Sequence, residues 1–160
     1  MDTIIKAKKG NKKAIKQIVK ENIIQVYRLI FLHTKYEEDA KNILRDTIDF
    51  IYENFSKVDN EKIILWMYKI AIINTNNFLK CNGMVEKNNS LNNYYYNNKI
   101  KMYESIDLLD LKYRNVVILK CYFDLSYYEI GYILDLNSDT VKIYFRQSLK
   151  NLKVNVGEGL

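Results

Sequence analysis

Apolar residues recur at intervals of three and four along most of this chain, and that spacing limits what the chain can fold into. Side chains three and four apart lie on one face of an α-helix, whereas a half-buried strand needs every second residue to be apolar. Over residues 11–33 the pattern is carried by five aliphatic side chains: Ile15, Val19, Ile23, Val26 and Ile30. The spacing predicts a long helix here and favours an all-α fold.

Two further helices are expected before residue 81. Thr34 and Glu37 have the spacing of a capping box, in which a hydroxyl and a carboxylate each bind a free backbone amide. The helix that follows would turn one face towards a core, formed by Ala40, Ile43, Leu44, Thr47, Ile51 and Phe55. After a loop over residues 56–60, a third helix is expected over residues 61–80, with Asp59 or Asn60 as its cap. Its buried side chains would be Ile63, Met67, Ile70, Ala71 and Phe78.

The stretch 81–99 interrupts the helical spacing. It is rich in asparagine, whose side chain competes with a helix by bonding its own backbone, and it contains three consecutive tyrosines over residues 94–96. We interpret it as a polar linker. The chain would then consist of two small helical domains, over residues 1–80 and 100–160.

A helix-turn-helix is the strongest local pattern in the C-terminal half. After a helix over residues 112–123, Ser126 and Glu129 form a second capping box, which would open a short helix over residues 127–134. A brief turn leads to Asn137, a good cap for a final helix over about residues 138–154. A short helix, a three-residue turn and a basic second helix are typical of DNA-binding helix-turn-helix motifs.

The final helix is expected to have two faces. One would pack on its own domain through Val141, Phe145, Leu149 and Leu152. The other is mostly cationic and carries Asp139, Lys142, Ile143, Arg146, Lys150 and Lys153. Such a face could enter the major groove, or it could be a solvated face on a structural helix; the short capped helix before it favours the first interpretation.

The bulk composition agrees with a nucleic-acid partner. The 160 residues carry a net charge of +6, which favours polyanions: nucleic acid first and anionic membrane second. No apolar run is long enough to span a bilayer and no signal peptide is evident, so a cytoplasmic protein is expected. Cys81 and Cys121 belong to no pair motif, which predicts neither a disulfide nor a zinc site. The single histidine, His33, is expected to cap a helix end at the surface.

The C-terminal half resembles region 4 of the extracytoplasmic-function sigma factors, members of the sigma-70 family. The resemblance lies in the segment LSYYEIGYIL (125–134), the following residues 140–142, and the lead-in over residues 109–122. In the N-terminal half, residues 38–40 and the helix after them resemble region 2.2, and residues 66–71 resemble the tryptophan-centred motif of region 2.4. The match covers nearly the whole chain except the linker and the extreme C-terminus.

The resemblance implies a non-enzymatic protein that brings core RNA polymerase to promoter DNA and is held inactive by an anti-sigma factor, without a cofactor, metal or small-molecule substrate. The second helix would bind the polymerase clamp through Asp39, Asn42, Arg45 and Asp46. The third helix would bind the minus-10 element through Lys62, Lys69, Asn76, Asn77 and Lys80. The last helix would read the minus-35 element through Ser138, Asp139, Thr140, Lys142, Ile143, Arg146 and Lys150.

The chain departs from the family pattern at several positions. Arg45 stands in place of a glutamine, and Ile72 and Ile73 in place of arginine and asparagine. In the helix-turn-helix, Gly131 replaces a small alanine, and Asp135 replaces the turn glycine, where the backbone needs a residue that tolerates positive φ. Asp110 stands where the family usually has proline.

Two other classes of protein remain as alternatives. A helix-turn-helix regulator, with an effector or dimerisation domain in its N-terminal half, would bind operator DNA without polymerase. A nucleic-acid-processing enzyme would need clustered carboxylates or a metal triad, and the sequence supplies neither pattern.

Overall fold

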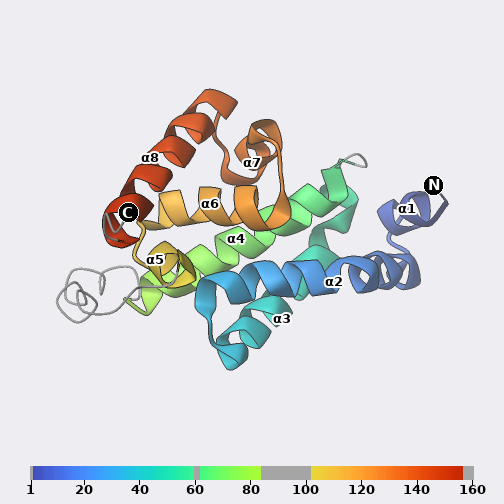
Figure 1. Ribbon diagram of the computed structural model, residues 1–160. Helices are drawn as coiled ribbons and strands as arrows, with labels where there is room; N and C mark the ends of the chain where they lie inside the picture. Colours follow the sequence, from blue (N-terminus) through green and yellow to red (C-terminus); the bar gives the residue numbers. More distant parts are fainter. Residues whose placement is uncertain (1, 60–61, 84–101, 157–160) are drawn as a thin grey trace. The chain divides into compact units, whose positions relative to one another are not determined.

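The computed structural model describes residues 2–59, 62–83 and 102–156, and every regular element in that part of the chain is a helix (Figure 1). The all-α prediction is therefore confirmed. The elements are α1 (Asp2–Lys8), α2 (Lys12–Thr34), α3 (Glu37–Asn54), the short 3-10 helix η1 (Phe55–Lys57), α4 (Ile63–Cys81), α5 (Met102–Asp107), α6 (Leu111–Phe123), α7 (Tyr127–Leu134) and α8 (Ser138–Val156). Helix α1 has no counterpart in the sequence-based expectations.

The chain divides into two compact units, Met1–Asn77 and Phe78–Leu160. The division falls within α4, a few residues before the stretch expected to be a linker. Most of that stretch, from residue 84 onwards, lies outside the described residues.

The core of the first unit is built around α2. The side chain of Asn11 caps this helix by accepting a hydrogen bond from the Ala14 amide at 3.1 Å. Helix α2 packs on α1 and on α3, which places its apolar stripe in the interior. Its most buried members are Val26, Leu29 and Ile30, each at most 1% exposed.

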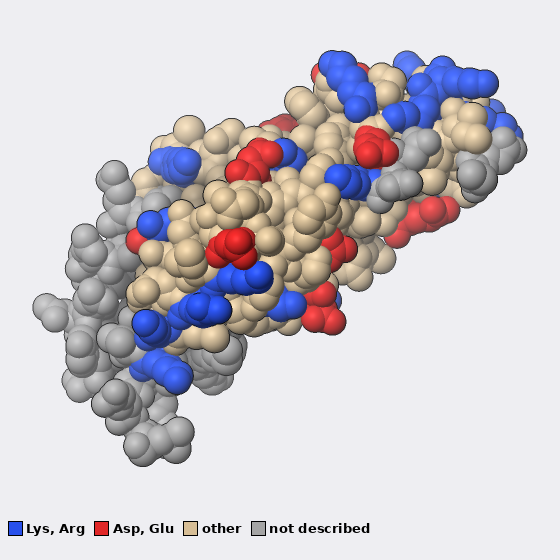
Figure 2. All heavy atoms as spheres, turned by 90° about the horizontal axis from the view of Figure 1, so that it is seen from above, with Lys and Arg blue, Asp and Glu red and all other residues tan. Residues whose placement is uncertain are grey.

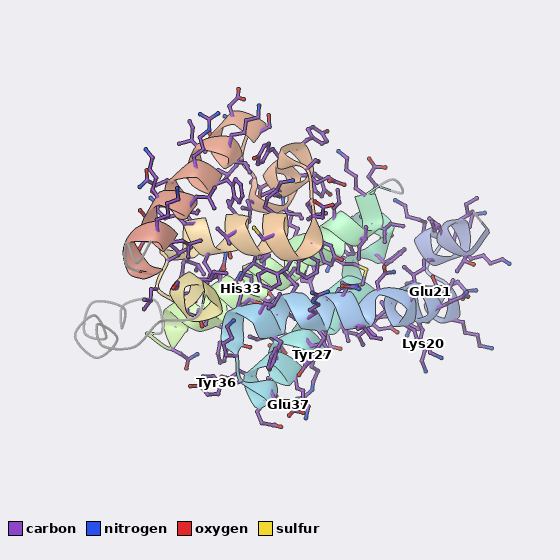
Figure 3. All side chains as sticks on the ribbon, viewed as in Figure 1. Lys20, Glu21, Tyr27, His33, Tyr36 and Glu37 are labelled. Atoms are coloured by element: carbon purple, nitrogen blue, oxygen red, sulfur yellow. The ribbon has the colours of Figure 1, made fainter. Side chains whose placement is uncertain are left out.

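The junction between α2 and α3 differs from the expected capping box. Helix α2 runs through Thr34, whose hydroxyl donates to the Ile30 carbonyl at 3.2 Å and so does not cap the next helix. Lys35 ends α2 in the left-handed region (φ 61°), and α3 begins at Glu37 after Tyr36, which makes no side-chain cap bond (Figure 3). The predicted box was wrong because a threonine in the last turn of a helix can bond back to the carbonyl four residues earlier.

His33 is buried, which corrects its expected position at the surface. Its exposed fraction is 3%, and its Nδ1 lies 2.9 Å from the Leu29 carbonyl oxygen. Because α2 continues past it, His33 shares the inward face with Leu29 and Ile30 (Figure 3).

Helix α4 is tied to α3 by a short chain of hydrogen bonds. Asn74 Nδ2 donates to the Thr47 hydroxyl at 3.1 Å, and that hydroxyl donates to the Ile43 carbonyl at 2.7 Å. Ile63, Met67, Ile70 and Ala71 are buried as predicted. Phe78 is only half-buried and Leu79 is buried instead, so the expected register is wrong at the end of the helix. Trp66 packs edge-on against Phe55, with ring centroids 6.3 Å apart.

Helix α6 forms the centre of the second unit, with residues 116–119 each at most 1% exposed. It packs on α8, α7 and α5. Arg114 is also buried, and its guanidinium donates to the carbonyls of Asp107 and Leu109 at the end of α5. Burial lowers the pKa of Arg114, and the nearby Asp107 carboxylate opposes that shift. The buried Arg114 guanidinium therefore stabilises the packing of α5 on α6.

The capping box before α7 is present as predicted. The Ser126 hydroxyl accepts from the Glu129 amide at 3.2 Å, and the Ser126 amide donates to the Glu129 carboxylate at 2.7 Å. The hydrogen bonds from Ser126, those of its hydroxyl first, lower the pKa of Glu129. The box fixes where α7 starts.

The turn from α7 to α8 accounts for two positions, Gly131 and Asp135, at which the sequence differs from the usual pattern of the family that it resembles. Asp135 adopts φ 56°, the left-handed conformation expected of it. The Gly131 carbonyl accepts hydrogen bonds from the amides of Asp135 and Leu136, the latter at 2.9 Å. A Cβ added at Gly131 would lie 2.5 Å from the Leu136 carbonyl oxygen, so an alanine would force this turn open.

We predict that Gly131→Ala destabilises the protein. Alanine gains about 0.5–1 kcal/mol in helix propensity, but overpacking costs about 1–3 kcal/mol, and the backbone that it meets cannot rotate away like a side chain. Urea denaturation should show a net loss of about 1–2 kcal/mol, with Lys150→Ala, an exposed position on α8, close to neutral. Equal or greater stability for Gly131→Ala would contradict this description of the turn.

Candidate nucleic-acid interface

Helix α8 is held on the second unit by one narrow face. It begins after Asn137, whose side-chain oxygen accepts from the Thr140 amide at 2.7 Å, as the sequence predicted. Val141 and Ser148 are fully buried and Leu152 is 5% exposed. The Ser148 hydroxyl donates to the Tyr144 carbonyl of its own helix at 2.6 Å and also lies 3.4 Å from the Tyr113 carbonyl of α6.

Leu149 does not belong to this packed face, contrary to expectation. Its exposed fraction is 39%, and Ser148 occupies the buried position instead. Successive residues turn by about 100° around a helix, so a buried Ser148 carries Leu149 towards solvent. The edge-to-face pair of Tyr113 and Tyr144, with centroids 5.5 Å apart, fixes the same rotation.

The opposite face of α8 is cationic and open to solvent. This face carries one carboxylate, that of Asp139, and four cations: Lys142, Arg146, Lys150 and Lys153. Lys142 Nζ lies 3.1 Å from Asp139 Oδ1, in an exposed pair that contributes little to stability. Figure 2 shows basic side chains following one another along α8. Such a row can neutralise successive phosphates along a nucleic acid.

Two members of this face are suited to more specific contacts. Ile143 is 60% exposed at the middle of the cationic face, where its side chain is accessible to a partner. Arg146 is exposed and forms no ion pair within the described part of the chain. The two remaining members of the predicted minus-35 set, Ser138 and Thr140, are half-buried in the first turn.

The predicted minus-10 residues form a strip on α4 rather than a pocket. Lys62, which precedes the helix, and Lys80 near its end are about 27 Å apart along the axis. Lys80 and Asn77 are exposed, whereas Lys62, Lys69 and Asn76 are half-buried. The side-chain oxygen of Asn76 is buried without a hydrogen-bond partner in the described residues.

The predicted polymerase-binding residues lie on α3. Asn42, Arg45 and Asp46 are exposed, and Asp39 is half-buried. Three further acidic residues on this helix are exposed and were not among the predicted contacts: Glu38, Asp49 and Glu53. Glu38 and Asp49 lie three or four residues from members of the predicted set, and Glu53 lies four residues beyond Asp49, a spacing that could have revealed them. Lys41 pairs with Glu37 at 2.6 Å, which lowers the pKa of Glu37. The outer face of α3 is therefore predominantly acidic.

The described residues hold no group of three side chains that could bind a metal ion. Cys81 and Cys121 are exposed free thiols. Within the same residues, no helix has the length and apolar character needed to cross a membrane.

Two sequence comparisons show similarity to sigma factors. The family "Sigma-70, region 4" matches residues 99–152, which include α7 and all but the last four residues of α8. The RNA polymerase sigma factor SigV of Bacillus subtilis (strain 168) is 25% identical in an alignment that covers 95% of this chain and 96% of SigV.

Two solved structures share the fold. CnrH, in complex with the cytosolic domain of CnrY, superposes with a TM-score of 0.73 at 16% identity, over 94% of this chain and 92% of CnrH. The sigma factor RpoE of Bartonella quintana, in complex with the anti-sigma factor NepR, superposes with a TM-score of 0.71 at 12% identity, over 92% of this chain and 99% of RpoE.

Both sequence comparisons point to sigma factors: the matched family is a region of the sigma-70 factors, and the relative that aligns with nearly the whole chain is an RNA polymerase sigma factor. These similarities confirm the resemblance to the extracytoplasmic-function sigma factors that the sequence motifs predicted.

Proposed function

We propose that this chain binds core RNA polymerase and directs it to promoters by reading the minus-35 element with α8 and the minus-10 element with α4. One observation carries the proposal: the helix-turn-helix presents a cationic α8 face in a chain that matches a sigma factor along nearly its whole length. A regulator that uses the same motif alone would not need the N-terminal unit to match as well.

The residues of α8 divide by the contacts that they can make. Arg146 has a planar fork that can pair bidentately with guanine, and the exposed Ile143 can contact a thymine methyl group. Lys142 lies one turn nearer the start of the helix and could reach a base or a phosphate. Lys150 and Lys153, farther along, are suited to phosphate contacts, which carry no sequence information.

We predict that Arg146→Ala and Lys153→Ala have different effects on promoter choice. Loss of a base contact should cost about 1–3 kcal/mol and relax specificity at one position, whereas loss of a phosphate contact should lower the salt slope by about one on every sequence. A selection on randomised minus-35 sequences with the holoenzyme separates the two. Equal, sequence-independent losses from both variants would mean that α8 supplies affinity but not specificity.

The acidic outer face of α3 is the proposed contact with core polymerase. We predict that Asp46→Lys weakens retention of core polymerase roughly tenfold or more, because it places a cation against a basic partner surface. Glu21→Lys, the same charge reversal at an exposed position of α2, is the matched control. If Asp46→Lys and the control retain core polymerase equally, the contact lies elsewhere.

An anti-sigma factor is the further partner that we propose. RpoE, which shares this fold, was solved in complex with an anti-sigma factor, and CnrH was solved with the cytosolic domain of CnrY. Such a partner would cover the DNA-binding and polymerase-binding faces together. Purification of the chain from its native host should recover it bound to a protein that blocks core binding; recovery of the free chain alone would count against this partner.

A further inference from the structure

The strongest charged feature outside the proposed sites is a set of lysines at the N-terminus, the N-terminal lysine cluster. Seven lysines occur over residues 6–20, with no acidic residue among them: Lys6, Lys8, Lys9, Lys12, Lys13, Lys16 and Lys20. Their combined charge exceeds the net charge of the whole chain, +6. None of the predicted contacts uses them.

A tight turn brings the lysines of α1 and α2 together. Gly10 adopts φ 84°, its amide donates to the Ala7 carbonyl at 2.9 Å, and the Asn11 amide donates to the Lys6 carbonyl at 3.1 Å. Ala7 is fully buried where α1 folds back on α2. Figure 2 shows Lys and Arg side chains gathered at the end of the first unit that carries these two helices.

The cluster is anchored beside the segment that leads into α4. Lys8 Nζ donates to the Val58 carbonyl, and α1 packs on η1. Val58 lies only four residues before Lys62, the first member of the minus-10 set. Helix α1 is therefore anchored at a segment that is close in sequence to one end of the strip proposed to bind the minus-10 element.

Five of the lysines are available to a partner. Lys9, Lys12, Lys13, Lys16 and Lys20 are all exposed, and none forms an ion pair within the described residues. The nearby Glu21 instead accepts a hydrogen bond from Gln17 at 3.2 Å. Uncompensated like charges repel one another, so a polyanion on this surface would relieve that repulsion.

The composition of the cluster suits the phosphates of a nucleic-acid backbone. Lysine binds phosphate as a point charge without fixed geometry, and the cluster has no arginine for bidentate recognition, so a contact that does not depend on sequence is expected. An anionic membrane would require apolar area beside the charge. The exposed large hydrophobic side chains near the cluster are Ile5, 46% exposed on α1, and Ile24, 75% exposed one turn beyond Lys20, and two isolated side chains do not make such an area.

We infer that the N-terminal lysine cluster binds the sugar-phosphate backbone of promoter DNA next to the minus-10 element. The inference rests on the proposed function and extends it with a contact that is independent of sequence. The cluster supplies affinity, and α4 and α8 supply specificity.

The test compares the triple variant K12Q/K13Q/K16Q with the charge-conserving control K12R/K13R/K16R. These side chains are exposed and form no ion pair within the described residues, so both variants should fold. Binding of the holoenzyme to a promoter fragment is measured over a range of salt concentrations. The slope of log affinity against log salt should become shallower by about two to three for the glutamine variant and stay unchanged for the arginine control.

Several outcomes would overturn the inference. An unchanged slope for the glutamine variant would show that the cluster does not contact phosphates. A loss of core polymerase binding without DNA would assign the cluster to polymerase instead. A lysine-dependent dimer of the free chain in sedimentation would assign it to the acidic α3 of a second copy, and lysine-dependent binding to phosphatidylglycerol vesicles with an unchanged DNA slope would assign it to membrane. If the wild-type chain forms no promoter complex with core polymerase, the proposed function itself fails, and this inference with it.

Discussion

The carbonyl of Gly131 is the group on which the DNA-facing geometry depends. By accepting hydrogen bonds from the amides of Asp135 and Leu136, it closes the turn between α7 and α8 and brings the Leu136 carbonyl against the glycine. That turn, with the Asn137 cap after it, sets where α8 begins and which side of it meets α6. Because Val141 and Ser148 are then buried, the cations of α8 face solvent. The alanine usual in the family does not fit this turn.

Local hydrogen-bonding patterns could be predicted from sequence where no nearby group competes for them. The box of Ser126 and Glu129 and the cap at Asn137 needed only residues within a few positions of each other. The box of Thr34 and Glu37 had the same spacing but was wrong, because α2 continues through Thr34, whose hydroxyl donates to the Ile30 carbonyl of the preceding turn. The sequence does not show whether such a hydroxyl will donate to a carbonyl before it or accept from an amide after it.

Tertiary contacts determine the features that could not be predicted from the sequence. Periodicity placed Leu149 in the packed face, but the fit of Ser148 and Tyr144 against Tyr113 rotates α8 and exposes it. Helix α1 is too short for periodicity to reveal, and its place depends on contacts with α2 and η1. The cationic face of α8 could be predicted because charged and apolar residues alternate there. The surface formed by the N-terminal lysine cluster could be recognised only from the structure, because it depends on how α1 packs on α2.

Transcription with purified core polymerase tests the central claim most directly. Run-off reactions on genomic fragments compare core polymerase alone, the chain alone, and the two together, with binding of the chain alone to the same fragments measured in parallel. If the chain is a sigma factor, transcripts from defined start sites should appear only when both are present, and the chain without polymerase should bind promoter DNA weakly. Tight, sequence-specific binding by the chain alone, with no start site gained on adding core polymerase, would contradict it and indicate a helix-turn-helix regulator.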